Sequence, residues 1–132
     1  MPVNDPIGDM LIRIKNALTA KHREVTVPAS KMKLRIAEIL KEEGYIKDFE
    51  FIDDGKQGVI RIILKYDRYG RPVIRDVKRV SKPGRRIYVD KDHIPRPLQG
   101  MGISIVSTSM GVMTGKEAKK KGVGGEVVAF IW

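Results

Sequence analysis

The residues best suited to chemistry lie in the last quarter of the chain, where three small hydroxyl residues follow an apolar stretch. Ser107, Thr108 and Ser109 are expected to form a loop that leaves a strand and precedes a short helix. Hydroxyl groups donate and accept hydrogen bonds, so they suit base edges and 2′-hydroxyl groups. Unpaired N–H groups at the start of a helix favour phosphate. Serine and threonine also occupy turns for purely local reasons, which is the alternative interpretation.

Positive charge is concentrated directly after this loop. The expected helix carries four lysines within six residues, namely Lys116, Lys119, Lys120 and Lys121. Some of them will be ordinary solvated lysines, but neighbouring like charges repel one another, and a bound anion would relieve that repulsion. The combination of hydroxyl groups, backbone amides and lysines indicates a surface that binds RNA.

A glycine-rich segment with one carboxylate comes next, Gly122-Val123-Gly124-Gly125-Glu126. The glycines follow a helix rather than open one, so they do not match a dinucleotide-binding or phosphate-loop fingerprint. They are predicted either to form a turn or to let the backbone approach a ligand closely. Glu126 could balance a lysine, accept a hydrogen bond from an exocyclic amino group of a base, or brace the hydroxyl loop.

Enzymatic chemistry has little support in the sequence. His22 and His93 are the only histidines and lack metal-ligand spacing, and the absence of cysteine excludes disulfides, thiolate zinc sites and cysteine catalysis. We therefore expect no catalytic residue, cofactor, metal or small-molecule substrate. The N-terminus has no signal-peptide pattern, and the longest apolar run, residues 127–132, is far too short to span a membrane. A cytoplasmic protein without a membrane partner is expected.

The net charge of +10 and the isoelectric point near 9.9 point to a polyanionic partner. The charge is unevenly distributed along the chain. Residues 1–66 carry 12 basic and 10 acidic residues, a balance of +2, whereas residues 67–132 carry 14 and 6, a balance of +8. A membrane surface is the rival polyanion, but no basic amphipathic helix carries the Trp/Phe face that such binding needs. The second half is therefore the expected nucleic-acid-binding part.

The first half predicts the order helix, strand, helix, strand, strand. Asp5 is the predicted N-cap of the first helix, with Pro6 at its first position. Ser30 is the predicted cap of the second helix, and Gly44 its end. The expected strands are a short one at residues 25–27 and two longer ones at residues 45–52 and 59–66.

The second half predicts mostly strands with one short helix. The expected strands cover residues 73–80, 86–89, 103–106 and 126–131, with a proline-fixed connector at 93–97. Thr114 begins a capping-box pattern that opens a helix of about two turns, which Gly122 ends. We therefore expect an α+β fold of two small packed lobes. Residues 1–66 would form an α-β-α-β-β lobe, and residues 67–132 a mostly antiparallel β lobe with a short helix.

Several segments together resemble the bacterial small-subunit ribosomal protein eight family. From Gly102 to Lys119 the chain matches the order glycine, two spacers, two aliphatics, Ser-Thr, two spacers, Gly, two aliphatics, four spacers, Ala-Lys. The resemblance spans the whole chain, through NDPIGDMLIRIKNA near the start, VPASK around Lys31, KPGRRIY, and GVGGE near the end. Agreement of independent segments in order and spacing makes the resemblance specific.

This resemblance implies a non-catalytic constituent of the small ribosomal subunit that binds the central domain of small-subunit ribosomal RNA during assembly. The hydroxyl loop would enter the minor groove of an irregular RNA helix, while Lys31 and residues 1–5 would touch a second RNA region. Further implied partners are the messenger RNA of the protein's own operon, which it would repress, and neighbouring small-subunit proteins such as ribosomal protein five. The candidate RNA-binding residues are Ser107, Thr108, Ser109, Gly111, Gly124, Gly125, Glu126, Tyr88, Arg86, Arg85, Lys116 and Lys31.

Two other classes of protein stay open on the residues alone. A small RNA-processing enzyme would need a cluster of titratable groups, and the carboxylates available in the basic half are Asp90, Asp92, Glu117 and Glu126. Metal-dependent turnover of RNA would reveal such an enzyme. A DNA-binding architectural protein is the other class, and competition between deoxyribose and ribose ligands would distinguish it.

Overall fold

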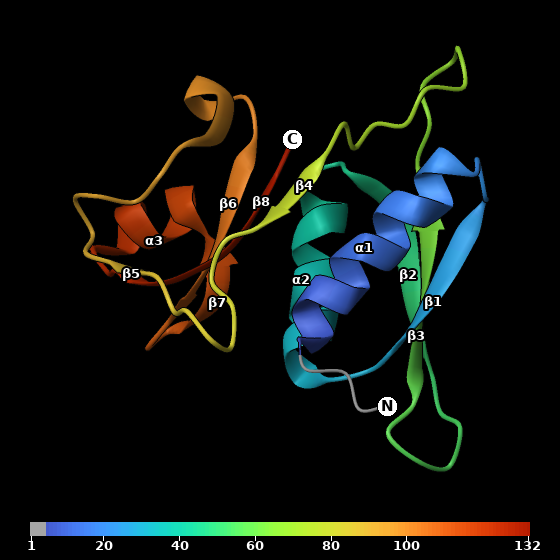
Figure 1. The fold of residues 1–132 in the computed structure, drawn as a ribbon, viewed down its shortest axis with the longest axis horizontal. Helices are drawn as coiled ribbons and strands as arrows, with labels where there is room; N and C mark the ends of the chain where they lie inside the picture. Colours follow the sequence, from blue (N-terminus) through green and yellow to red (C-terminus); the bar gives the residue numbers. More distant parts are fainter. Residues whose placement is uncertain (1–4) are drawn as a thin grey trace. The chain divides into compact units, whose positions relative to one another are not determined.

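The computed structural model describes residues 5–132, which contain three α-helices, one 3-10 helix and eight strands (Figure 1). The chain divides into two compact units, one formed by residues 10–75 and the other by residues 76–132 together with residues 5–9. Helices combined with two antiparallel sheets confirm the predicted α+β class. The division into lobes of residues 1–66 and 67–132, which the sequence analysis expects, stays a prediction.

The unit of residues 10–75 is built on a three-stranded antiparallel sheet. Its elements follow in the predicted order: α1 (Pro6–Thr19), β1 (Glu24–Pro28), α2 (Lys31–Glu42), β2 (Ile46–Ile52) and β3 (Val59–Leu64). The part of α1 from residue 10 onward belongs to this unit. β3 lies between β1 and β2, and its alternate residues Ile60, Ile62 and Leu64 are buried. This alternation is typical of a sheet with one covered face. Figure 1 shows α1 and α2 on the same side of the sheet.

Side-chain caps begin the helices where the sequence predicts them. The Asp5 carboxylate accepts a 3.1 Å hydrogen bond from the Gly8 N–H, and the Ser30 hydroxyl accepts one of 3.2 Å from the Lys33 N–H. Each bond satisfies an N–H group that has no partner within its helix. Gly44 follows α2 with a φ of +81°, a conformation that glycine adopts without strain. The predicted starts of α1 and α2 are therefore confirmed.

The second unit is a sheet centred on β8 (Gly125–Ile131) with one short helix. Its other elements are β4 (Val77–Arg79), β5 (Tyr88–Val89), a 3-10 helix η1 (Pro97–Gly100), β6 (Ile103–Thr108), β7 (Gly111–Thr114) and α3 (Gly115–Lys121). β8 pairs with β4, β5 and β6, and β6 pairs with β7. Ile105, Val106, Val127 and Ala129, in the middle of the sheet, are at most 1% exposed. The candidate site residues at the ends of these strands are thus supported by a packed core.

Two of the strands predicted in the second half of the chain are shorter than expected. The strand expected at residues 73–80 is restricted to β4, because the Val73 N–H bonds to the Lys65 carbonyl and only the residues from Asp76 onward pair with the end of the chain. The strand expected at residues 86–89 is restricted to β5. There the Ile87 N–H bonds to the hydroxyl of Ser81 rather than to a neighbouring strand.

Candidate nucleic-acid interface

The hydroxyl triplet lies at the end of a β-hairpin, which corrects the expected loop. Ser107 and Thr108 are the last residues of β6, where they pair with Val112 and Gly111 of β7. Ser109 and Met110 alone form the turn between the two strands. The strand β7 therefore separates the triplet from the start of α3, which the sequence analysis placed directly after the loop. The sequence analysis did not predict β7, because this strand has only four residues and two of them are Gly and Thr.

Thr108 uses its hydroxyl to hold this hairpin turn. The hydroxyl donates a 2.8 Å hydrogen bond to the Gly111 carbonyl and accepts one of 3.0 Å from the Met110 N–H. Gly111 itself has a φ of +111°, which favours glycine at the end of the turn. Thr108 and Gly111 thus have a structural function within the hairpin.

Three candidate residues form a row across adjacent strands. Glu126 of β8 lies opposite Ser107 of β6 on one side and opposite Tyr88 of β5 on the other. Residues directly opposite each other in neighbouring strands project from the same face of a sheet. Within residues 5–132 the hydroxyls of Ser107 and Tyr88 have no hydrogen-bond partner, and Tyr88 is 69% exposed. We call these three residues the Ser107–Glu126–Tyr88 row.

The carboxylate of Glu126 is fixed through one of its two oxygens. Oε2 accepts hydrogen bonds from the Ser81 hydroxyl at 2.6 Å and from Nη1 of Arg86 at 3.0 Å. Oε1 accepts no hydrogen bond from any residue that the structure describes, so it is available to a ligand. Burial favours a higher pKa for Glu126, but the hydrogen bonds from Ser81 and Arg86 outweigh it and lower the pKa. Glu126 is therefore ionised and oriented at neutral pH.

Ser81 contacts the candidate site, and the sequence analysis did not single it out. It is fully buried, and its hydroxyl accepts a 3.1 Å hydrogen bond from the Ile87 N–H while donating to Glu126. One of the three roles predicted for Glu126 was to balance a lysine, but the cation that it pairs with is Arg86. Among the described residues its bonds brace the Ser81–Arg86 segment and not the hydroxyl triplet. A serine forty-five residues away carries no sequence signal for this contact.

The glycines beside Glu126 are explained by close packing of the backbone. A Cβ atom at Gly124 would lie 2.3 Å from the Val89 carbonyl oxygen, and one at Gly125 would lie 2.2 Å from the Ser107 carbonyl oxygen. Both distances are far below van der Waals contact, and the obstructing atoms are backbone atoms that cannot rotate away. Gly124 and Gly125 therefore allow β5 and β6 to approach β8, which sets the spacing of the row.

The remaining candidate residues are distributed over other surfaces. Arg85 ends a turn whose backbone is closed by two 2.9 Å hydrogen bonds with Lys82, and its side chain is exposed. Lys116 lies on α3, whose start is capped by a 3.2 Å hydrogen bond from the Glu117 N–H to the Thr114 hydroxyl and whose end is Gly122, as predicted. Lys31 is the exposed first residue of α2 in the other unit. Residues 1–4 of the proposed second contact lie outside the described residues.

An ion pair supports the start of the chain within the same unit as the row. The guanidinium of Arg79 contacts both carboxylate oxygens of Asp5 at 3.1–3.2 Å and donates a 2.7 Å hydrogen bond to the Val128 carbonyl. Arg79 also helps to lower the pKa of Glu126 through its charge. This cation, which the sequence analysis did not single out, therefore contributes to the electrostatics of the row.

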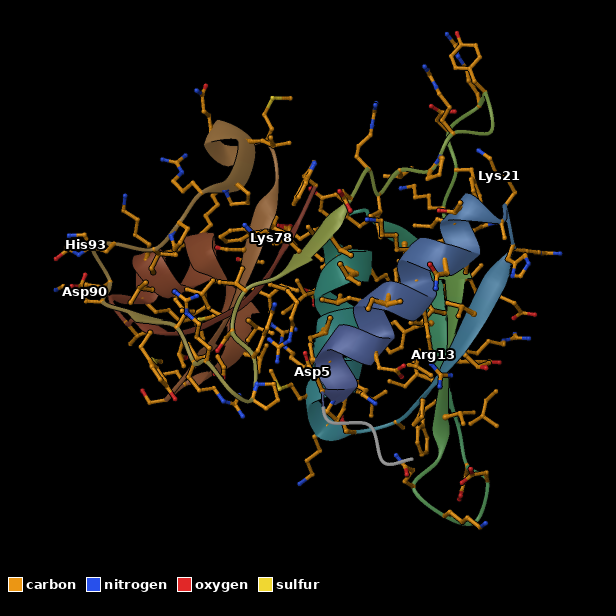
Figure 2. All side chains as sticks on the ribbon, in the orientation of Figure 1. Asp5, Arg13, Lys21, Lys78, Asp90 and His93 are labelled. Carbon is orange, nitrogen blue, oxygen red and sulfur yellow. The ribbon has the colours of Figure 1, made fainter. Side chains whose placement is uncertain are left out.

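Asp90 and Glu126, two of the four carboxylates considered for an RNA-processing enzyme, have different hydrogen-bond partners. Asp90 bonds to Nδ1 of His93 at 2.7 Å, and Figure 2 shows these two side chains next to each other, while Glu126 bonds to Ser81 and Arg86. The hydrogen bond from His93 lowers the pKa of Asp90, and the same bond raises the pKa of His93. Within residues 5–132 no three His, Asp or Glu side chains are grouped so that they could hold a metal ion.

In the described part of the chain, no helix has the length and apolar character needed to cross a membrane.

Comparison with known proteins identifies the family. The family model described as Ribosomal protein S8 matches residues 5–132. The small ribosomal subunit protein uS8 of Caldicellulosiruptor bescii is 60% identical over 132 residues, which is 100% of both chains. The proteins of the same name from Anaeromyxobacter sp. (strain K) and Geobacillus kaustophilus are 58% and 55% identical, again over 100% of both chains. The resemblance seen in the sequence is thus confirmed, and the chain belongs to the ribosomal protein S8 family.

Proposed function

We propose that this protein is a structural constituent of the small ribosomal subunit that binds small-subunit ribosomal RNA without catalysing a reaction. Its relatives over the full length are named small ribosomal subunit proteins. The balance of +8 in residues 67–132 supplies the long-range attraction that RNA binding requires. The target proposed from the family resemblance is the central domain of that RNA, in the cytoplasmic ribosome.

The observation that carries this proposal is the Ser107–Glu126–Tyr88 row. Among residues 5–132 it presents a hydroxyl and a carboxylate oxygen without hydrogen-bond partners, beside an exposed aromatic ring on adjacent strands of one sheet. The minor groove of an A-form helix is wide and shallow and displays 2′-hydroxyls and base edges, whereas its major groove excludes side chains. A rigid row of small polar groups beside an aromatic ring fits such a groove.

Each member of the row has a distinct role in this proposal. The Ser107 hydroxyl exchanges hydrogen bonds with a 2′-hydroxyl or a base edge, and the Tyr88 ring stacks on an exposed base or sugar. Oε1 of Glu126 accepts from an exocyclic amino group, since a carboxylate can only accept. A free carboxylate repels phosphate, so it selects a base edge over the RNA backbone.

The other candidate residues support the row or extend it. Thr108 and Gly111 hold the hairpin, so that Ser109 at the turn is the second serine hydroxyl available to RNA. Gly124 and Gly125 set the strand spacing. Arg85 and Arg86 would reach phosphates near the row. A separate RNA contact by Lys31 and residues 1–5, and a protein contact with ribosomal protein five, are proposed on the family resemblance.

The test is binding of a central-domain fragment of small-subunit ribosomal RNA, compared with a generic RNA duplex of equal length. The affinity for the fragment should fall about tenfold, or about 1.4 kcal/mol, in each of the variants Ser107→Ala, Glu126→Gln and Tyr88→Ala. They should weaken the duplex much less. Tyr69→Ala is the matched control, because Tyr69 is 66% exposed but lies in the other unit. Equal losses on both RNAs would reduce the row to nonspecific contact.

A second function proposed for the same row is repression of the protein's own operon messenger RNA. A surface that reads shape, 2′-hydroxyls and a few base edges accepts any RNA folded into that shape. The messenger and the ribosomal fragment should therefore compete, with the ribosomal RNA bound more tightly. The measurement is a competition titration repeated with Ser107→Ala. Simultaneous binding of both RNAs would contradict a shared site.

A further inference from the structure

A pocket of about 320 Å³ lies between the segment of residues 91–100 and the helix α3. Its size is within the range of about 300–1,000 Å³ that is typical of small-molecule sites. One wall comes from the connector around η1, another from the first turns of α3, and the floor includes Ser104 of β6. The pocket contains none of the Ser107–Glu126–Tyr88 row.

The pocket is lined by four cationic side chains and one carboxylate. The cations are Lys91, Arg96, Lys116 and Lys119, and the carboxylate is Asp92, which leaves a balance of +3. Within the described part of the chain, none of the four cations makes a hydrogen bond or an ion pair through its side chain. Like charges around a concave surface repel one another, and the shape concentrates their field on the space they enclose. A bound anion would neutralise that field.

The lining of the pocket includes one polar side chain of β6, that of Ser104. Ser104 is only 4% exposed, and its hydroxyl makes no hydrogen bond with any described residue. The hydroxyl is not among the fully enclosed, unsatisfied polar atoms of the described residues, so it keeps access to the space of the pocket. Gly115 leaves room for this hydroxyl, since a Cβ atom there would lie 2.1 Å from the Ser104 Oγ. A ligand oxygen in the pocket would supply the partner that the protein does not.

The pocket and the row lie on opposite faces of the sheet. Ser104 and Ser107 are three residues apart on β6, and side chains alternate between the two faces of a strand. The helix α3, which follows β7, lies against the Ser104 face, as the proximity of Gly115 to the Ser104 hydroxyl shows. A ligand in the pocket would therefore not occupy the surface proposed for the RNA groove.

We propose that this pocket binds a phosphate group. A phosphate carries up to two charges and several acceptor oxygens, which matches one hydroxyl donor and four cations that have no partner among the described residues. The guanidinium of Arg96 can engage two oxygens at once, while the lysines act as point charges. The phosphate would come either from a free nucleotide or from an RNA backbone. This inference goes beyond the proposed function, because it needs neither the row nor a groove.

The experiment titrates the full-length protein with inorganic pyrophosphate and with adenosine 5′-monophosphate at low salt, following backbone amide NMR signals. The signals of Ser104, Gly115 and Lys116 should shift first. The double variant Lys91→Gln/Arg96→Gln should weaken pyrophosphate binding at least tenfold. Lys47→Gln/Lys56→Gln is the matched control, because it removes two exposed cations from the other unit and should change binding less than twofold.

Ser104→Ala separates a specific site from diffuse attraction. It leaves every charge in place, and removal of one hydrogen bond to a charged ligand should weaken pyrophosphate about tenfold. Thermal unfolding checks that the variant is folded. Absence of shifts at Ser104 and Gly115, or equal weakening by the matched control, would overturn the proposal.

A competition experiment identifies the source of the phosphate. Displacement of the mononucleotide by a short single-stranded RNA would assign the pocket to the RNA backbone, and lack of displacement would assign it to a free nucleotide. Either result supports a phosphate site. Tyr88→Ala should leave the affinity for pyrophosphate unchanged and lower the affinity for ribosomal RNA. An error in the proposed RNA function and an error in the phosphate proposal would therefore give different results.

Discussion

The hydroxyl of Ser81 donates a 2.6 Å hydrogen bond to Oε2 of Glu126, joining residues 45 positions apart in the sequence. Because the same hydroxyl accepts from the Ile87 N–H, one buried serine orients both the β4–β5 connection and the carboxylate. Oε1 of Glu126 is thereby held in a defined position, and it accepts no hydrogen bond from the described residues. A functional side chain fixed through one atom and open at another loses little freedom on binding.

Replacement of Ser81 by alanine should affect stability as well as binding. The change removes the partner of a backbone N–H and of a carboxylate oxygen, so the free energy of unfolding should fall by about 1–3 kcal/mol. Urea denaturation measures this. Ser109→Ala is the control, because Ser109 is exposed and, among the described residues, has no hydrogen-bond partner; its change should stay within about 0.5 kcal/mol. Equal effects of the two substitutions would contradict the bracing role of Ser81.

Thr108 gives a prediction about the hairpin. Thr108→Val keeps the shape but removes both hydroxyl bonds of the turn, so it should lower the free energy of unfolding by about 1 kcal/mol or more. Faster hydrogen exchange of the Met110 amide would locate the effect. Thr108→Ser retains the hydroxyl and should keep the turn closed. A similar loss in both variants would mean that the methyl group, not the hydroxyl, matters.

Gly125 tests the close approach of β6 and β8. Gly125→Ala places a Cβ atom 2.2 Å from the Ser107 carbonyl oxygen, so the strands must separate. Overpacking of this kind costs about 1–3 kcal/mol, and the row should lose affinity for RNA as its spacing changes. Gly84→Ala is the matched control, since a Cβ there meets nothing within 4 Å and its φ is not positive. Thermal unfolding and RNA titration of both variants are the measurements.

The Asp5–Arg79 ion pair predicts a dependence of stability on acid. Burial favours a higher pKa for Asp5, but the hydrogen bonds from Arg79 and from the Gly8 N–H lower the pKa below the ordinary value of 3.8. A lowered pKa in the folded state contributes stability above the unfolded pKa, and that contribution is lost as the pH falls through the folded value. Stability should therefore decline below about pH 4.

Asp5→Asn is the variant for this prediction. The amide oxygen still caps α1 through the Gly8 N–H, but the charge opposite Arg79 is gone. The variant should be less stable at neutral pH and should lose less stability on acidification than the wild type. Denaturation at a series of pH values measures both. Glu43→Gln removes an exposed carboxylate and should lose as much stability on acidification as the wild type. A smaller loss in this variant as well would contradict the assignment to Asp5.

Salt dependence tests whether Arg85 contacts phosphate. Its side chain is exposed, and each phosphate contact contributes about −0.7 to −0.9 to the slope of log K against log salt. Arg85→Gln should therefore make the slope less steep by about that amount for every RNA tested. Lys47→Gln, an equal loss of charge in the other unit, should leave the slope unchanged. An unchanged slope in Arg85→Gln would show that this arginine faces solvent.

The sequence by itself determined the α+β class, the capped starts of the helices at Asp5, Ser30 and Thr114, and the family. These features depend on local chemistry: a cap satisfies backbone groups three residues away, and the family segments are contiguous. The concentration of charge after residue 66 is likewise a property of the chain alone.

The tertiary structure decided which of the candidate residues act together. Pairing of β5, β8 and β6 brings Tyr88, Glu126 and Ser107 into one row, and no local pattern encodes that register. It also decided that Gly125 lies close to the backbone of β6 and that the Thr108 hydroxyl bonds within its own hairpin turn. Hydrogen-bond partners such as Ser81 are selected by strand pairing between distant segments, because register and burial, not residue type, determine which polar groups meet.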